Sequence, residues 1–126
     1  MSSDYQAGAC NIGSTERNRR RQMGYVVSAV AVIYVGVVLW LGLPETYLLG
    51  TFVFLYGGAL GILQARNRFC AAYGMTGRYG FDDGDGTVDD ASARSQDRMR
   101  AFRLVGKAIA VALAGTAVVY GLAILL

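Results

Sequence analysis

Two cysteines are the residues of this sequence best suited to chemistry. Cys10 lies before the first apolar block and Cys70 lies just after the second. Arg17 follows the first thiol, and Arg66 and Arg68 precede the second. Positive neighbours favour the thiolate, which is the reactive form of cysteine. The two positions therefore define a candidate thiol pair.

Three roles are open to this pair. It could be a redox couple, or it could supply half of a tetrahedral zinc site that a dimer or aspartate oxygens would complete. Neither cysteine lies in a C-x-x-C motif, and the cytoplasm normally keeps thiols reduced. These two facts favour structural or inert thiols over the redox and metal interpretations.

Other signs of catalysis or metal binding are weak. The acidic run from Asp82 to Asp90, DDGDGTVDD, lacks the register of an EF-hand calcium loop, so it predicts a solvated, mobile loop. The chain has no histidine, which is the commonest general acid-base group and metal ligand. It also lacks a Ser/His/Asp set, a phosphate-binding loop and a dinucleotide fingerprint. We therefore expect a non-enzymatic protein with no metal and no other cofactor.

The elements that must position the cysteines are membrane spans. Apolar residues make up 54% of the 126 residues and charged residues 17%, against about 45–50% and about 25% in soluble domains. Residues 23–43 carry no charge, and 21 helical residues extend about 31 Å, which matches a hydrocarbon core of about 30 Å. A cleavable signal peptide would have a shorter apolar region. We therefore expect an uncleaved anchor.

The sequence predicts an all-α membrane protein, a small bundle of three transmembrane helices. Pro44 ends the first span, and so short a turn makes the second span antiparallel to it. The third span is preceded by a basic amphipathic segment at the head-group surface, with Met99, Phe102 and Val105 on its apolar side. The predicted divisions are a cytoplasmic N-terminus (1–22), a hairpin (23–65, with spans 23–43 and 47–65), a cytoplasmic Gly/Asp-rich loop with the amphipathic helix (66–103), and the third span (104–126).

The distribution of positive charge predicts the orientation. All 12 Lys and Arg residues precede the first span or lie between the second span and the start of the third. The positive-inside rule then places the N-terminus and the long loop in the cytoplasm and the C-terminus outside. We expect the membrane to be the cell membrane of a prokaryote. The arginine clusters abut membrane spans, so we expect no nucleic-acid partner. The strongest topology determinants are Arg17, Arg19, Arg20, Arg21, Arg66 and Arg68.

Small residues mark candidate helix-packing faces. Gly57 and Gly61 form a small-xxx-small pair in the second span, and Ala110 and Ala114 form one in the third. Such pairs let two helix backbones approach closely. Glycine is also simply common in membrane helices. Besides the lipid bilayer, the expected partners are another membrane protein or further copies of this chain.

Two short motifs resemble those of a known family. Asn11-Ile12-Gly13, followed by Glu16-Arg17 and Arg20, resembles the N-I/V-G-x-x-D/E-R-x-x-R opening of a small transmembrane domain found in YgaP-type inner-membrane proteins. Phe69-Cys70-Ala71-Ala72-Tyr73, followed by Gly77, resembles that family's F-C-P-x-Y…G closing, with Ala71 in place of proline. The resemblance implies a two-span hairpin with paired terminal motifs. No rhodanese domain is present, so it implies no sulfur transfer.

The leading functional hypothesis is a multi-pass membrane protein that acts as a non-enzymatic accessory or scaffold subunit. The spans carry no ionisable group at mid-depth, and channels and transporters usually have such groups. One alternative is a thiol-based redox or sulfur-handling protein that uses Cys10 and Cys70. The other is a subunit of a homo-oligomeric pore.

Overall fold

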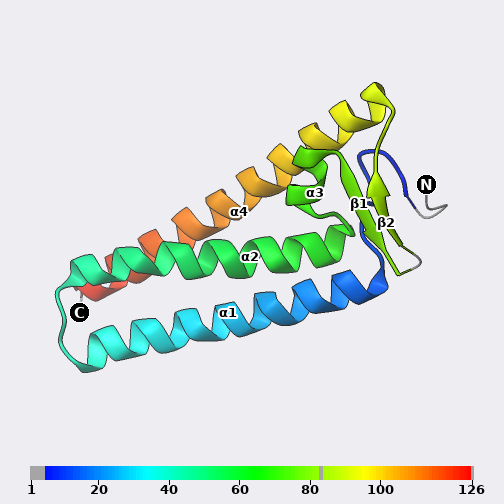
Figure 1. Ribbon diagram of the computed structural model, residues 1–126. Helices are drawn as coiled ribbons and strands as arrows, with labels where there is room; N and C mark the ends of the chain where they lie inside the picture. The colour runs from blue at the N-terminus through cyan, green and yellow to red at the C-terminus, as the bar shows by residue number, and fades with distance from the viewer. Residues whose placement is uncertain (1–4, 83, 126) are drawn as a thin grey trace.

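Three long helices dominate the computed structural model, which describes residues 5–82 and 84–125 (Figure 1). Within these residues, three helical segments are long and apolar enough to cross a membrane: Ser14–Trp40, Glu45–Asn67 and Ala91–Leu125. The predicted all-α, three-span fold is therefore confirmed. The elements in chain order are α1 (Ser14–Trp40), the 3-10 helix η1 (Glu45–Gly50), α2 (Thr51–Asn67), α3 (Ala71–Thr76), β1 (Arg78–Phe81), β2 (Gly84–Thr87) and α4 (Ala91–Leu125).

The three long helices form a layer rather than a closed bundle. α2 lies in the middle, with α1 packed on one side and α4 on the other (Figure 1). Over the described residues, α1 and α4 make no extended contact with each other. Each outer helix therefore keeps most of its surface free for lipid or for another helix, and large side chains such as Val32 are exposed there.

Glycines set the close crossing of α1 and α2. A Cβ atom on Gly61 would lie 2.9 Å from the carbonyl oxygen of Arg20 and 3.0 Å from the Cα of Gly24. A Cβ atom on Gly58 would lie 3.2 Å from the carbonyl oxygen of Gly24. Backbone thus meets backbone, which is the geometry that small residues permit in membrane helices.

α4 is one continuous helix of 35 residues. At about 1.5 Å per residue it extends about 52 Å, well beyond a hydrocarbon core of about 30 Å. The basic amphipathic segment predicted before the third span is thus continuous with that span, in one helix. Met99 and Phe102, its predicted apolar side, are exposed, whereas Ala93, Asp97 and Ala101 are buried. The first turns of α4 instead pack against the β-hairpin and the N-terminal segment. We call this folded end of the molecule the cap.

The predicted mobile loop is also folded over its described residues, which exclude residue 83. The short helix α3 leads into an antiparallel hairpin, in which Arg78 pairs with Thr87 and Phe81 with Gly84. The composition of this segment did not predict the hairpin, because acidic residues dominate it. The hairpin is held by a few apolar residues: Tyr79 and Phe81 on β1, and Val88 after β2, are buried against Ala93 of α4.

Candidate functional site

The N-terminal segment, residues 5–13, closes the cap. It runs between the β-hairpin and the helix ends, and Ile12 forms a parallel bridge with Gly80 of β1 (Figure 1). Tyr5 packs on Tyr79 with ring centroids 5.7 Å apart. We call this segment the strap, because it is held at both of its ends.

Asn11 holds one end of the strap and is fully buried. Its backbone N–H donates to the carbonyl of Arg68 (3.1 Å), and its own carbonyl accepts from the N–H of Gly80 (2.8 Å). Its side chain pairs with the backbone of Cys70, donating to the carbonyl (3.1 Å) and accepting from the N–H (2.7 Å). One residue therefore joins the strap, the end of α2 and the β-hairpin.

Asp97 of α4 holds the other end of the strap and is also fully buried. Its carboxylate accepts a hydrogen bond from the Tyr5 hydroxyl and another, at 2.7 Å, from the N–H of Gly8. Burial first, and then the hydrogen bond to Asp97, raises the pKa of the Tyr5 phenol above its ordinary value. Tyr5 therefore remains a hydrogen-bond donor at neutral pH.

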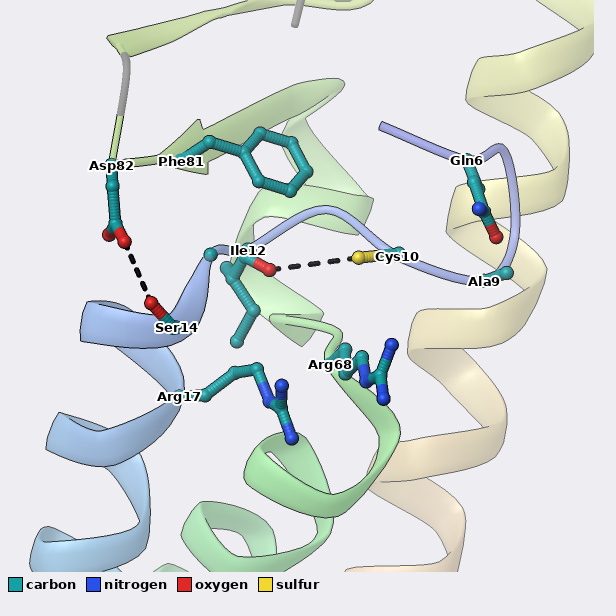
Figure 2. A pocket seen from close by; sticks show the side chains of 10 residues that line it. Gln6, Ala9, Cys10, Ile12, Ser14, Arg17, Arg68, Phe81 and Asp82 are labelled. Atoms are coloured by element: carbon teal, nitrogen blue, oxygen red, sulfur yellow. Dashed lines mark hydrogen bonds between the residues drawn. The ribbon is translucent and has the colours of Figure 1, made fainter. Parts of the chain in front are cut away.

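A pocket of about 570 Å³ opens between the strap, the start of α1 and the end of α2 (Figure 2). It contains a thiol, two guanidinium groups and a carboxylate, from Cys10, Arg17, Arg68 and Asp82. This pocket is the candidate functional site. Its other lining residues are Gln6, Ala9, Ile12, Gly13, Ser14 and Phe81.

The two cysteines are free, and they differ in exposure. Cys70 is only 2% exposed, and its backbone is held by Asn11. Cys10 is partly exposed in the pocket, and its thiol donates to the carbonyl of Ile12 at 3.7 Å. The structure thus brings the two cysteine-bearing segments together through Asn11, but it gives only Cys10 access to the pocket.

The six arginines predicted to determine the topology lie in two places, the start of α1 and the end of α2. Arg17 lines the pocket, where its Nε donates to the carbonyl of Ala65 at 3.3 Å. Arg68 ends α2 in the left-handed conformation (φ 55°), which turns the chain toward Cys70. Arg66 is exposed. The others lie along α1, where Arg19 and Arg20 bind Glu16, and Arg21 binds Asn18.

The predicted packing residues also divide. Gly61 lies in the α1–α2 crossing, whereas Gly57 lies at its edge, with an added Cβ 3.4 Å from Val27 Cγ1. Ala110 and Ala114 are exposed on α4, so they take no part in packing within the chain. Ala108 and Ala112 lie instead on the side of α4 that faces α2, and both are fully buried.

Three residues in or near the site have roles that the sequence did not indicate. Gln64 is buried, and its side-chain oxygen accepts a hydrogen bond from the N–H of Ala71 at the start of α3. Asp97 anchors the strap. Asp82 caps α1: one carboxylate oxygen accepts from the Ser14 hydroxyl (2.7 Å) and the other from the N–H of Thr15 (3.3 Å). A weak signal for Asp97 existed, because it falls four residues from both Ala93 and Ala101.

The Asp82 cap predicts a pH dependence. The hydrogen bonds from Ser14 and then Thr15 lower the pKa of this carboxyl below its ordinary value. Its stabilising effect is therefore complete above the unfolded-state pKa of about 3.9 and is lost as the pH falls through the lower folded value. We expect Asp82→Asn to lower the thermal midpoint slightly at neutral pH, with the difference from wild type shrinking in acid.

Asp89→Asn is the matched control, because Asp89 is exposed and near the same hairpin. Melting curves by circular dichroism, from about pH 6 down to about pH 3, would make the comparison. Equal effects of the two substitutions at all pH values would contradict the cap.

Comparison with known proteins does not assign the chain to a family. No protein family model, curated protein or solved structure matches the chain. Among residues 5–82 and 84–125, no cluster of three or more Cys, Asp or Glu side chains is placed to hold a metal ion.

Proposed function

We propose that this chain is a non-enzymatic accessory or scaffold subunit of a membrane assembly, which packs against a partner helix through the outer face of α4. The observation that carries the proposal is a stripe of small residues on the side of α4 that faces away from α2. Its members recur every three or four residues and so share one helix face. They are Gly106, Ala110, Ala114, Ala117 and Gly121.

This stripe is open within the chain. A Cβ atom added to Gly106 or Gly121 would meet no atom within 4 Å. Larger exposed side chains, among them Val111, Leu113 and Val118, border it. A shallow groove with apolar walls is the shape that a second transmembrane helix needs for close approach.

The cap supports a scaffolding role. Asn11 and Asp97, two polar residues that could serve a reaction, are each hydrogen-bonded to a distant segment of the same chain. A buried polar network whose members are satisfied makes its surroundings rigid. The cap thus fixes the three helix ends relative to one another.

The proposed orientation places the cap in the cytoplasm of a prokaryotic cell and the C-terminus outside. The starts of α1 and α4 and the end of α2 meet at the cap (Figure 1), and the arginines of the sequence lie around these three helix ends. The positive-inside rule supports this assignment.

The test is photo-crosslinking in native membranes. A photoreactive residue at Ala114 is expected to capture a protein, whereas the same residue at Val32, which is 74% exposed on α1, is expected to capture mainly lipid. Ala114→Leu should then weaken the association. A product of two copies of this chain would favour the homo-oligomer, including the pore. Lipid adducts alone at Ala114 would contradict the proposal.

A thiol-based function is the second candidate, favoured by one observation. The Cys10 thiol shares its pocket with Arg17 and Arg68, two cations that could hold an anionic thiol reagent or substrate (Figure 2). The buried Cys70 would support this site and would not itself react.

Alkylation distinguishes the two cysteines. In native membranes we expect Cys10 to be alkylated at least about tenfold faster than Cys70, because Cys70 becomes accessible only when the cap opens. Mass spectrometry of the alkylated chain would measure both rates. Normal oxidant tolerance of a Cys10→Ser strain would remove the thiol-based candidate, and equal alkylation rates would contradict the buried position of Cys70.

A further inference from the structure

A second hollow, of about 490 Å³, lies between α1 and α2 and reaches Tyr73 of α3. Its walls change from charged to apolar along the helices. Glu16, Arg19 and Arg20 stand at one end, and Met23, Val27 and Leu60 at the other. The remaining lining residues are Gly57, Gly61, Gln64 and Tyr73. We refer to this hollow as the α1–α2 groove.

The groove crosses the edge of the membrane. The 11 residue steps from Glu16 to Val27 rise about 17 Å along α1, and only the last four of them, about 6 Å, lie beyond Met23. Met23 begins the uncharged stretch of α1. Arg19 and Arg20 therefore lie about one helical turn from the membrane edge, at the level of the lipid head groups.

The charge at the mouth of the groove favours an anion. Two guanidinium groups face one carboxylate there, because Glu16 accepts from Arg19 at 3.2 Å and from Arg20 at 3.4 Å. Arg20 also lies over the ring of Tyr73, 5.9 Å from its centroid. Each guanidinium has five N–H donors. These contacts orient both arginines and leave donors for a phosphate group.

The apolar end of the groove exists because Gly57 has no side chain. Val27 and Leu60 flank a notch that a larger residue at position 57 would fill. In a membrane, such a hollow is filled by an acyl chain or by a neighbouring side chain. The cationic mouth directly above it favours the acyl chain of a lipid with an anionic head group.

From this arrangement we infer that the α1–α2 groove is a binding site for one anionic phospholipid. The head-group phosphate binds Arg19 and Arg20, and an acyl chain lies against Met23, Val27 and Leu60 over Gly57. This site is separate from the outer face of α4 and does not depend on which partner binds there.

Native mass spectrometry of the full chain tests the head-group contact. The protein is equilibrated in mild detergent with phosphatidylglycerol and phosphatidylcholine that carry the same acyl chains. We expect one phosphatidylglycerol to be retained preferentially, and the preference to fall about fivefold for each arginine lost in Arg19→Gln/Arg20→Gln. Arg19→Lys/Arg20→Lys should keep most of it.

Arg66→Gln/Arg98→Gln is the matched control, because it removes two exposed charges at the same end of the molecule outside the groove. The control should keep the lipid preference. An equal loss in the control and in the groove variant would show attraction to surface charge in general and would overturn the inference.

Two further measurements test the acyl-chain contact. Gly57→Leu should displace the retained lipid, whereas Gly36→Leu, at a glycine of α1 with open space around it, should not. A photoreactive residue at Leu60 should give a lipid adduct. Retention unchanged by Gly57→Leu, or a protein adduct at Leu60, would overturn the inference. Circular dichroism and gel filtration confirm that each variant is folded.

Discussion

Replacing Asn11 with alanine is expected to lower the free energy of unfolding by about 2–4 kcal/mol. The substitution removes both side-chain hydrogen bonds to the backbone of Cys70. Because Asn11 and Cys70 are both buried, water cannot replace these partners, and each unpaired buried group costs about 1–3 kcal/mol. The strap should detach from the end of α2, and the Cys70 thiol should become accessible.

Unfolding by sodium dodecyl sulfate in mixed micelles, followed by circular dichroism, measures the free energy, and the alkylation rate of Cys70 reports the local opening. Asn18→Ala is the matched control, since Asn18 is exposed on α1. The control is expected to change stability by less than about 0.5 kcal/mol. If Asn11→Ala were as stable as the control and Cys70 stayed protected from alkylation, Asn11 would not be the residue that holds the strap to the end of α2.

Replacing Gly61 with leucine is expected to separate α1 from α2. The new Cβ would lie 2.9 Å from the carbonyl oxygen of Arg20 and 3.0 Å from the Cα of Gly24. These are backbone atoms, so no side-chain rotation relieves the overlap and the helices must move apart. Overpacking of this kind costs about 1–3 kcal/mol even where side chains can adjust. We expect a loss of at least about 2 kcal/mol.

The neighbouring glycine provides the control for this prediction. A Cβ on Gly57 would make an ordinary contact, 3.4 Å from Val27 Cγ1, so Gly57→Ala should be nearly neutral. Paired cysteines across the crossing, in a chain with Cys10 and Cys70 replaced, would report the separation of the helices by the loss of disulfide formation. A crossing that forms equally well in Gly61→Leu would show that these glycines do not set the distance between α1 and α2.

The comparison of Gly57, Gly58 and Gly61 shows the limit of sequence patterns within a span. The sequence indicates a small-residue patch, and the patch is used. Successive residues of a helix point about 100° apart, so contact depends on the rotation of α2 about its own axis. Composition does not fix that rotation. The structure therefore selects Gly58 and Gly61, and on α4 it turns Ala108 and Ala112 inward and Ala110 and Ala114 outward.

The cap shows a second limit. Asp97 appears in the sequence as one more polar residue in a basic stretch, and Asn11 as part of a short motif. Both are buried because their hydrogen-bond partners come from segments far away in the chain, Tyr5 and Gly8 for Asp97 and Cys70 for Asn11. Polar groups can be buried only when such partners are present. Local composition contains no information about these partners, so the acidic run from Asp82 to Asp90 was predicted to be a mobile loop.

The sequence alone determined that three helices are able to cross a membrane, that a short turn at Pro44 reverses the chain, and that the arginines gather at one end. These features depend on the length of uncharged runs and on the backbone restriction of proline, which are local properties. Only the tertiary structure decided that the helices form a layer around α2, that α4 continues unbroken into the cap, and that Cys10 lines the pocket whereas Cys70 is buried. These features depend on helix rotation and on hydrogen bonds between distant segments, which exist only once the chain has folded.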